Sequence, residues 1–180
     1  MGGFIVIKAA RWGDEGFTLT ELATVLLIVA ILITMLVPAF ASMQARAEKV
    51  KCITNLKSVS IATNLYVQDK GNWPQIDPNL ITTRREEYSQ QWIDALRPYK
   101  ISPINWICPS VQKAMGSPDI EKPENARVDY IAMPFDSNRF TPFRWPNHPW
   151  FIERGAAHGN GSLIIFANGS IRESNEYSAK

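Results

Sequence analysis

The residues best suited to chemistry are two histidines, two cysteines and a loose group of acids. Neither His148 nor His158 lies at the spacing from a cysteine that is typical of metal sites. The sequence also contains no nucleophile elbow, phosphate-binding loop or HExxH motif. We therefore predict that the protein is not an enzyme, and that it has neither catalytic residues nor a metal site.

Four acids offer the oxygen ligands that calcium prefers, namely Asp119, Glu121, Glu124 and Asp129. Their spacing is too loose for an EF-hand loop. We expect the protein to bind no cofactor. The alternative is that it binds calcium at this acidic stretch.

Residues 134–150 combine four prolines with five Phe or Trp residues. Such a proline-stiffened aromatic segment suits two interpretations. It forms core material folded over a sheet, which we favour, or it presents an exposed face to a partner subunit, a polysaccharide or a secreted cargo.

Charge and hydrophobicity divide the chain unevenly. Residues 22–45 form a run of 24 residues without charge, of which 19 are hydrophobic. From Arg46 onward, 17 basic and 14 acidic residues are scattered, whereas a nucleic-acid site needs a clustered basic footprint. The sequence predicts a hydrophobic rod joined to one modest soluble domain, with no nucleic-acid partner.

The apolar run is long enough to cross a bilayer, which takes roughly 20 residues in a helix. A secretory signal peptide is the alternative, because Lys8 and Arg11 precede the run. Its apolar core would be shorter, about 7–15 residues, and would end at a small-residue cleavage site. The residues Ala39, Ala41 and Ser42 keep that alternative open.

The entrance to the run, Gly16-Phe17-Thr18-Leu19-Thr20-Glu21, and the later Pro38 together resemble a type IV prepilin. The resemblance implies that a membrane peptidase cuts between Gly16 and Phe17 on the cytoplasmic side. Phe17 then becomes the N-methylated first residue of a mature protein that keeps its apolar helix. Because Asp14 and Glu15 depart from the basic leaders of the family, the orientation follows from the resemblance and not from charge.

The resemblance also gives roles to Glu21 and Pro38. Glu21 neutralises the free amine of a neighbouring subunit's first residue in the filament core. The alternative is a helix-start carboxylate favoured only by the helix dipole. Pro38 removes a helical hydrogen bond, so we expect it to kink or locally open the helix, unless it is a merely tolerated membrane-helix proline.

An apolar stripe continues the helix beyond the hydrophobic run. It consists of Cys52, Leu56, Val59, Thr63 and Tyr66, at spacings of three and four residues. Gly71 and Pro74 end it. We predict one helix over residues 17–70 and three regions: a leader (1–16), a transmembrane or filament-core half-helix (17–45), and a globular head (46–180) that includes the amphipathic half.

The head is predicted to be an α+β domain, a small antiparallel sheet laid on the helix. Thr83 and Glu86 predict a capping box before a short helix that carries Tyr88 and Trp92. Residues 128–133 predict a strand. Residues 162–173 predict a hairpin with a type I′ turn at Asn168-Gly169.

This hairpin carries a second resemblance, because His158 is followed by nine residues and Asn168-Gly169. It is similar to the His, nine residues, Asp-Gly motif of a large group of pseudopilin-like proteins. The segments around Cys52 and Cys108 also resemble that group. Here Asn168 replaces the acid. We interpret His158 as a structural residue that braces the turn.

The outward orientation implied by the resemblance places both cysteines in an oxidising compartment. A Cys52–Cys108 disulfide would close 57 residues and contribute roughly 4 kcal/mol in the chain-entropy model. Two separate buried thiols are the alternative.

By resemblance, the protein is a subunit of a type IV pilus-like filament or a type II secretion pseudopilus. It is anchored once in a bacterial inner membrane, with its head in the periplasm or at the cell surface. The implied partners are the prepilin peptidase, other pilin or pseudopilin subunits, the inner-membrane assembly platform and a secreted cargo. The alternative is a membrane-anchored module that never polymerises and binds a glycan or protein ligand.

Leader processing is the most direct test of the sequence interpretation. In cells with the peptidase, the intact mass should correspond to a chain that starts at an N-methylated Phe17, and in cells without it the first 16 residues should remain. Cleavage after Ala41 or Ser42 would instead identify a secretory signal peptide.

Overall fold

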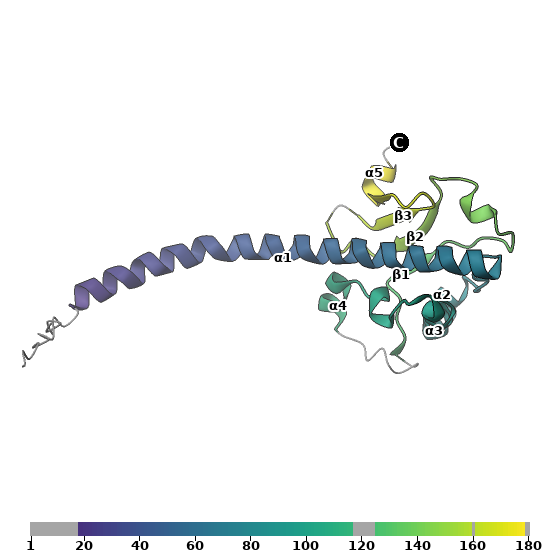
Figure 1. Cartoon of the computed structure of the whole chain (residues 1–180). Coiled ribbons are helices and arrows are strands. Elements are labelled where there is room, and N and C mark those ends of the chain that lie inside the picture. The colour runs from purple at the N-terminus through teal and green to yellow at the C-terminus, as the bar shows by residue number, and fades with distance from the viewer. Residues whose placement is uncertain (1–17, 117–124, 160, 179–180) are drawn as a thin grey trace, which may run out of the picture. The chain divides into compact units, whose positions relative to one another are not determined.

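The computed structural model describes residues 18–116, 125–159 and 161–178 and has an α+β fold (Figure 1). A helix of 52 residues, α1 (Leu19–Lys70), packs against a four-stranded antiparallel sheet. This pilin-like architecture confirms the fold class predicted from the sequence. The chain divides after Ser42 into two compact units.

In the second unit, α1 buries the stripe that the sequence predicted. Cys52, Leu56, Val59 and Thr63 are buried, and Tyr66 is half-buried against the same core. The helix ends at Gly71, which has a φ of 75° and donates its N–H to the Val67 carbonyl at 3.0 Å. Glycine adopts this left-handed conformation without steric cost, which explains why the helix stops here.

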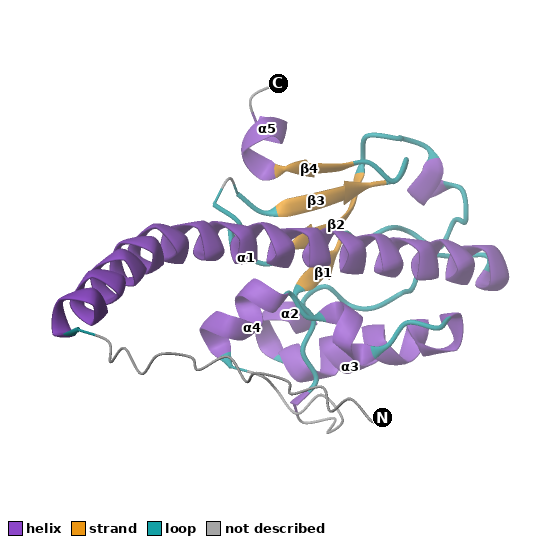
Figure 2. Ribbon diagram, turned by 60° about the vertical axis from the view of Figure 1, so that its left-hand side comes forward, coloured by secondary structure: helices purple, strands orange, loops and turns teal. Residues whose placement is uncertain are grey.

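The sheet has the strand order β1-β2-β3-β4, with every neighbouring pair antiparallel. Its strands are β1 (Tyr130–Ala132), β2 (Pro149–Glu153), β3 (Leu163–Phe166) and β4 (Ile171–Glu173). The first is shorter than predicted. The second was not predicted, because four of its five residues are buried and it lacks the alternating pattern that identifies a half-buried strand. In Figure 2 the sheet lies beside α1. The helices of residues 80–115 gather at its β1 edge, whereas α5 (Ser174–Ser178) lies next to β4.

The β3–β4 hairpin exists where it was predicted, but its turn is not type I′. Gly169 has a φ of 76°, whereas Asn168 does not have a positive φ. The N–H of Gly169 donates to the Phe166 carbonyl at 2.9 Å. A turn closed by a single left-handed glycine suits a longer hairpin loop, so the type I′ prediction was wrong.

The predicted short helix is α3 (Arg85–Leu96), continued by a 3₁₀ turn at Arg97–Tyr99. The capping box predicted for it was wrong. Thr83 ends α2 (Leu80–Thr83), and its hydroxyl donates to the Asn79 carbonyl, while α3 starts without a side-chain cap. Other helical elements in the described residues include the 3₁₀ turns Pro103–Trp106 and Thr141–Phe143 and the helices α4 (Pro109–Met115) and α5 (Ser174–Ser178).

Aromatic rings fill the centre of the head. Phe151, on β2, is fully buried. Its ring lies 5.6 Å from that of Trp92, 5.9 Å from that of Trp73 and 6.1 Å from that of Trp106. These rings come from α3, from the segment after α1 and from the 3₁₀ turn before α4, so β2 joins three parts of the chain.

The proline-rich aromatic segment divides between the two interpretations. Trp150 is buried, and its indole N–H donates to the Pro142 carbonyl at 2.8 Å. By contrast, Phe140 and Trp145 are 70% and 51% exposed. The segment is therefore core material at its end and an exposed aromatic surface in its middle.

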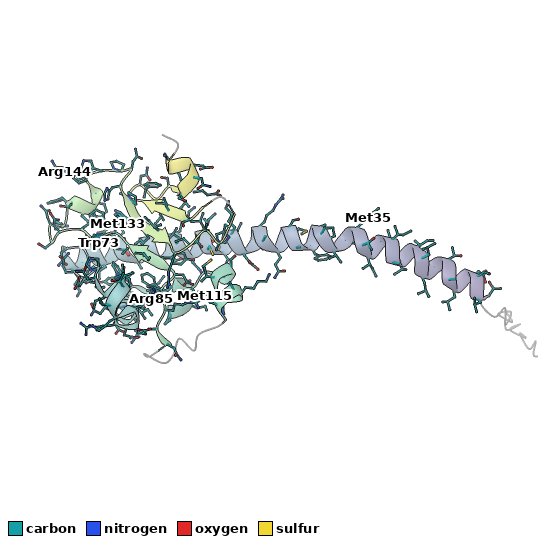
Figure 3. All side chains as sticks on the ribbon, turned by 180° about the vertical axis from the view of Figure 1, so that it is seen from behind. Met35, Trp73, Arg85, Met115, Met133 and Arg144 are labelled. Carbon is teal, nitrogen blue, oxygen red and sulfur yellow. The ribbon has the colours of Figure 1, made fainter. Side chains whose placement is uncertain are left out.

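The first unit contains the apolar part of α1. Every described residue up to Ser42 is exposed, and Figure 3 shows Met35 among the side chains that project from this part of the ribbon. In the described part of the chain, α1 is the one helix long and apolar enough to cross a membrane. It continues through Pro38. The kink stays a prediction, and Gly16 and Phe17 lie outside the described residues.

The ring cluster predicts a large effect for one truncation. Phe151→Ala should lower the free energy of unfolding of the detergent-solubilised chain by about 3–5 kcal/mol, because it opens a cavity among three tryptophans. Urea unfolding followed by tryptophan fluorescence measures the loss. The exposed Phe140→Ala is the matched control and should change it by about 0.5 kcal/mol or less. Equal losses in both variants would contradict this packing.

Candidate functional site

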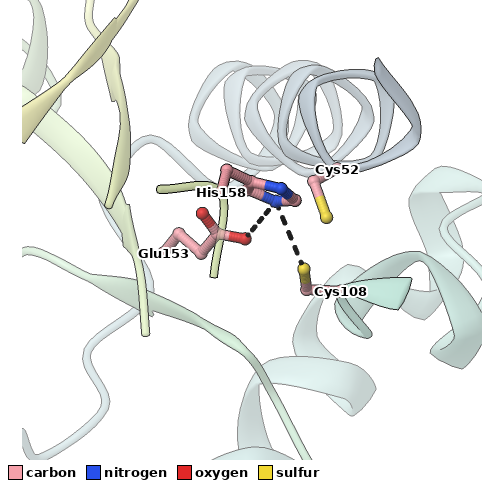
Figure 4. A group of neighbouring side chains, drawn as sticks. All are labelled: Cys52, Cys108, Glu153 and His158. Carbon is pink, nitrogen blue, oxygen red and sulfur yellow. Dashed lines mark hydrogen bonds and ion pairs between the residues drawn. The ribbon is translucent and has the colours of Figure 1, made fainter. Parts of the chain in front are cut away.

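Four ionisable side chains from distant parts of the sequence meet inside the head: Cys52, Cys108, Glu153 and His158. Their potential ligand atoms all lie within 4.8 Å of one another. The Nε2 atom of His158 lies 3.6 Å from Cys108 Sγ and 3.1 Å from Glu153 Oε1. Figure 4 shows the four side chains pointing toward one another, one of them from α1.

The cluster is almost inaccessible to solvent. Cys52 and Cys108 are fully buried, and the side chains of Glu153 and His158 are 0% and 2% exposed. Ionisable groups are rarely placed in such an environment without partners, because their charged forms lose hydration. This cluster is therefore the strongest candidate in the described head for a site with a specific role.

A side-chain-to-backbone hydrogen bond holds the segments of the two cysteines together. Cys52 lies on α1, and Cys108 lies immediately before α4. One helical turn after Cys52, the Asn55 side chain donates to the Ile107 carbonyl at 3.0 Å. This buried hydrogen bond fixes the segment that carries Cys108 against α1.

A second buried contact holds Cys108 from the side of the sheet. Its N–H donates to Asp129 Oδ2 at 2.9 Å, and Arg127 Nε forms an ion pair with Asp129 Oδ1 at 3.1 Å. Burial raises the pKa of the Asp129 carboxyl, while the Cys108 N–H and Arg127 oppose that rise. The carboxylate thus links the strand region to the Cys108 loop.

Glu153 ends β2, and His158 lies in the loop between β2 and β3. Glu153 Oε2 accepts a hydrogen bond from the Leu163 N–H at 3.2 Å, which leaves Oε1 directed at His158. Leu163 is the first residue of β3. The sheet itself therefore orients the carboxylate.

The residues around Cys52 favour the protonated form of its thiol. A hydrogen bond with Cys108, together with burial, raises the pKa of Cys52 above its ordinary value. Burial and the neighbouring Cys52 also raise the pKa of Tyr130, whose hydroxyl donates to the Cys52 carbonyl at 3.4 Å. Without a cation, this thiol is not a reactive nucleophile.

The structure brings Cys52 and Cys108 together, as a disulfide would require, but both are thiols. The bond itself stays a prediction. The hydrogen bonds of His158 go to Cys108 and Glu153, whereas Asn168 and Gly169 lie in the β3–β4 turn. The side-chain contacts of His158 are therefore with this cluster and not with the Asn168-Gly169 turn, which it was predicted to brace.

Sequence spacing did not indicate the cluster. Cys52 and Cys108 lie 56 residues apart, and Cys108 and Glu153 lie 45 residues apart. Only Glu153 and His158 are close in sequence. The one local sign is Glu153 itself, an acid that ends the apolar run Trp150-Phe151-Ile152. Of the acids considered for calcium, Asp129 is held by Arg127 and Cys108. The others, Asp119, Glu121 and Glu124, lie outside the described residues.

Glu21 has local partners at the start of α1. Its Oε2 accepts from the Thr18 hydroxyl at 2.6 Å and from the Thr18 N–H at 2.9 Å. The hydroxyl oxygen of Thr18 in turn accepts a hydrogen bond from the Glu21 N–H at 3.3 Å. This reciprocal arrangement is a capping box, so Glu21 stabilises the helix start within a single subunit.

Comparisons with known protein families, with curated proteins and with solved structures found no match to this chain. The functional argument therefore depends on the residues and their geometry.

The Asp129 contacts predict a stability difference between two substitutions. Asp129→Ala should lower the free energy of unfolding by about 3–5 kcal/mol, because it leaves the buried Cys108 N–H without its acceptor and the half-buried Arg127 without its carboxylate partner. Asp129→Asn keeps an acceptor for the Cys108 N–H and should lose less. Equal, small losses in urea unfolding would show that the carboxylate does not hold this loop.

Proposed function

We propose that this protein is a subunit of a filament of the type IV pilus or type II secretion pseudopilus kind. The subunit is held in the inner membrane by the apolar part of α1 and cleaved by the prepilin peptidase between Gly16 and Phe17. An assembly platform then transfers it into the filament with other subunits. The head faces the periplasm or the cell surface, where it contacts a secreted cargo.

The observation that supports this proposal most strongly is the exposed apolar surface of the first unit. Large apolar side chains protrude from α1 along this unit, and they include Leu22, Leu26, Ile33 and Phe40. Each such side chain gains about 1.5–3 kcal/mol when it is removed from water. The surface therefore needs a covering, which a bilayer supplies before assembly and neighbouring helices supply afterwards.

Glu21 favours a filament over a simple anchor. A carboxylate within an apolar span costs about 2.5–3.5 kcal/mol at the bilayer centre on insertion scales, and less near the interface. Its capping box with Thr18 uses one carboxylate oxygen, Oε2. A neighbouring subunit's N-terminal amine at Phe17 would neutralise the charge when the helix leaves the membrane.

A second candidate function is a membrane-anchored module that binds a ligand without polymerising. The supporting observation is the exposed aromatic surface formed by Phe140 and Trp145, flanked by Arg139 and Arg144. The guanidinium groups lie 5.4 and 5.0 Å from the ring centroids of Phe140 and Trp145, respectively. Such a surface suits stacking against a sugar ring or a protein side chain.

Substitutions at Glu21 and Thr18 separate charge pairing from helix capping. Glu21→Gln keeps a capping side chain but removes the charge, whereas Thr18→Ala weakens the cap and keeps the charge. We expect Glu21→Gln and Glu21→Ala to reduce incorporation into filaments at least about tenfold, which corresponds to about 1.4 kcal/mol. Thr18→Ala should assemble nearly normally.

Immunoblots of sheared filaments measure incorporation, and membrane fractionation with intact mass controls for insertion and leader removal. Normal incorporation of Glu21→Gln together with failure of Thr18→Ala would show that only the cap matters. That result would contradict the charge-pairing role.

A further inference from the structure

We propose that Cys52, Cys108, Glu153 and His158 form a structural zinc site in the head. The inference does not depend on filament assembly, because all four residues lie in the second unit. Two thiolates, an imidazole and a carboxylate are the nitrogen, sulfur and oxygen ligands that Zn²⁺ accepts. Four protein ligands leave no open position, which is typical of a structural and not a catalytic site.

The distances between the ligand atoms suit a tetrahedral ion. Bonds of about 2.3 Å to sulfur and about 2.0–2.2 Å to nitrogen and oxygen place a sulfur and a nitrogen ligand about 3.6 Å apart. They place a nitrogen and an oxygen ligand about 3.4 Å apart. The structure has 3.6 Å between Cys108 Sγ and His158 Nε2, and 3.1 Å between His158 Nε2 and Glu153 Oε1.

The remaining separations require only a small contraction. No two potential ligand atoms are more than 4.8 Å apart, whereas two sulfur ligands of tetrahedral zinc lie about 3.8 Å apart. Each separation therefore has to shorten by about 1.2 Å at most to match a tetrahedral coordination shell.

Outer contacts already orient the ligands. The Leu163 N–H holds Glu153 Oε2 and leaves Oε1 at the proposed ion. Asp129 holds the Cys108 N–H, and Asn55 holds the adjacent Ile107 carbonyl. Hydrogen bonds of this kind fix the direction of metal ligands and commonly accompany metal sites.

A disulfide between Cys52 and Cys108 explains only half of the cluster. It accounts for the two sulfurs, but it gives no reason for a buried glutamate and histidine whose atoms converge on the same point. One His158 nitrogen faces both Cys108 Sγ and Glu153 Oε1, and a single N–H can serve only one of them well. An ion at that point is a partner for all four groups.

A zinc ion at this place would join four segments of the head: α1, the loop before α4, the end of β2 and the β2–β3 loop. Binding to the folded state alone stabilises that state by mass action. The site would thus fix a loop-rich head on its helix.

Cobalt provides a spectroscopic test with the full-length, detergent-solubilised protein. After removal of metal with EDTA, titration with Co²⁺ alone should give one equivalent of tetrahedral visible bands together with a thiolate-to-cobalt charge-transfer band. Added Zn²⁺ should displace the cobalt and abolish these bands. Reduced, folded wild-type protein without the charge-transfer band would overturn the proposal.

Variants assign the ligands. Cys52→Ser, Cys108→Ser and His158→Gln should each weaken Zn²⁺ binding at least about 100-fold in competition with a chelating dye, and Glu153→Gln about 10- to 100-fold. His148→Gln is the matched control, because it removes the other histidine, which lies outside the cluster. Affinity that is unchanged in His158→Gln would also overturn the proposal.

Alkylation distinguishes the zinc site from the disulfide even if a variant fails to fold. Wild-type protein from fresh membranes is denatured with EDTA and alkylated without reductant. A zinc site predicts two labelled cysteines by intact mass. No labelled cysteine would show a Cys52–Cys108 disulfide, and the proposal would be wrong.

Discussion

The constraint on which the structure depends is the exposed apolar surface of α1 before Met43. From Leu22 to Ala41 this stretch is uncharged and mostly apolar, and every described residue before Met43 is exposed. A helix that is apolar all round is stable only in a bilayer or among other helices. The capping box of Thr18 and Glu21 starts this helix with a polar contact. Anchoring and assembly are therefore alternative coverings for one surface.

Beyond Met43 the same helix changes from an all-round apolar surface to a single buried stripe, and the head is built on that stripe. Phe151 and its neighbouring rings form the centre of the core, while the cluster of Cys52, Cys108, Glu153 and His158 connects α1 to the sheet and to the loop before α4. The strands of the head are only three to five residues long, so such cross-connections supplement the hydrogen bonds of a small sheet.

Periodic features were predictable from the sequence, and features set by distant contacts were not. The stripe from Cys52 to Thr63 and the end of α1 at Gly71 follow from spacing and glycine chemistry. β2 was missed because a buried strand without alternation gives no period-two pattern. Glu153 was missed as a site residue because only the fold brings it to Cys52 and Cys108, which are distant in sequence. The position of the turn at Asn168 was predicted correctly, but its type was not. The length of the loop, and not the Asn-Gly pair, determines its geometry.

The central claim is that the apolar part of α1 is covered by lipid before assembly and by neighbouring helices afterwards. Photo-crosslinking in cells from an unnatural amino acid at Met35, which is 71% exposed, tests it most directly. The account predicts crosslinks to protein subunits in the filament fraction, and their loss in Glu21→Gln, whose crosslinks should be to lipid. Lipid crosslinks alone in the wild-type chain, in cells that make filaments, would contradict it.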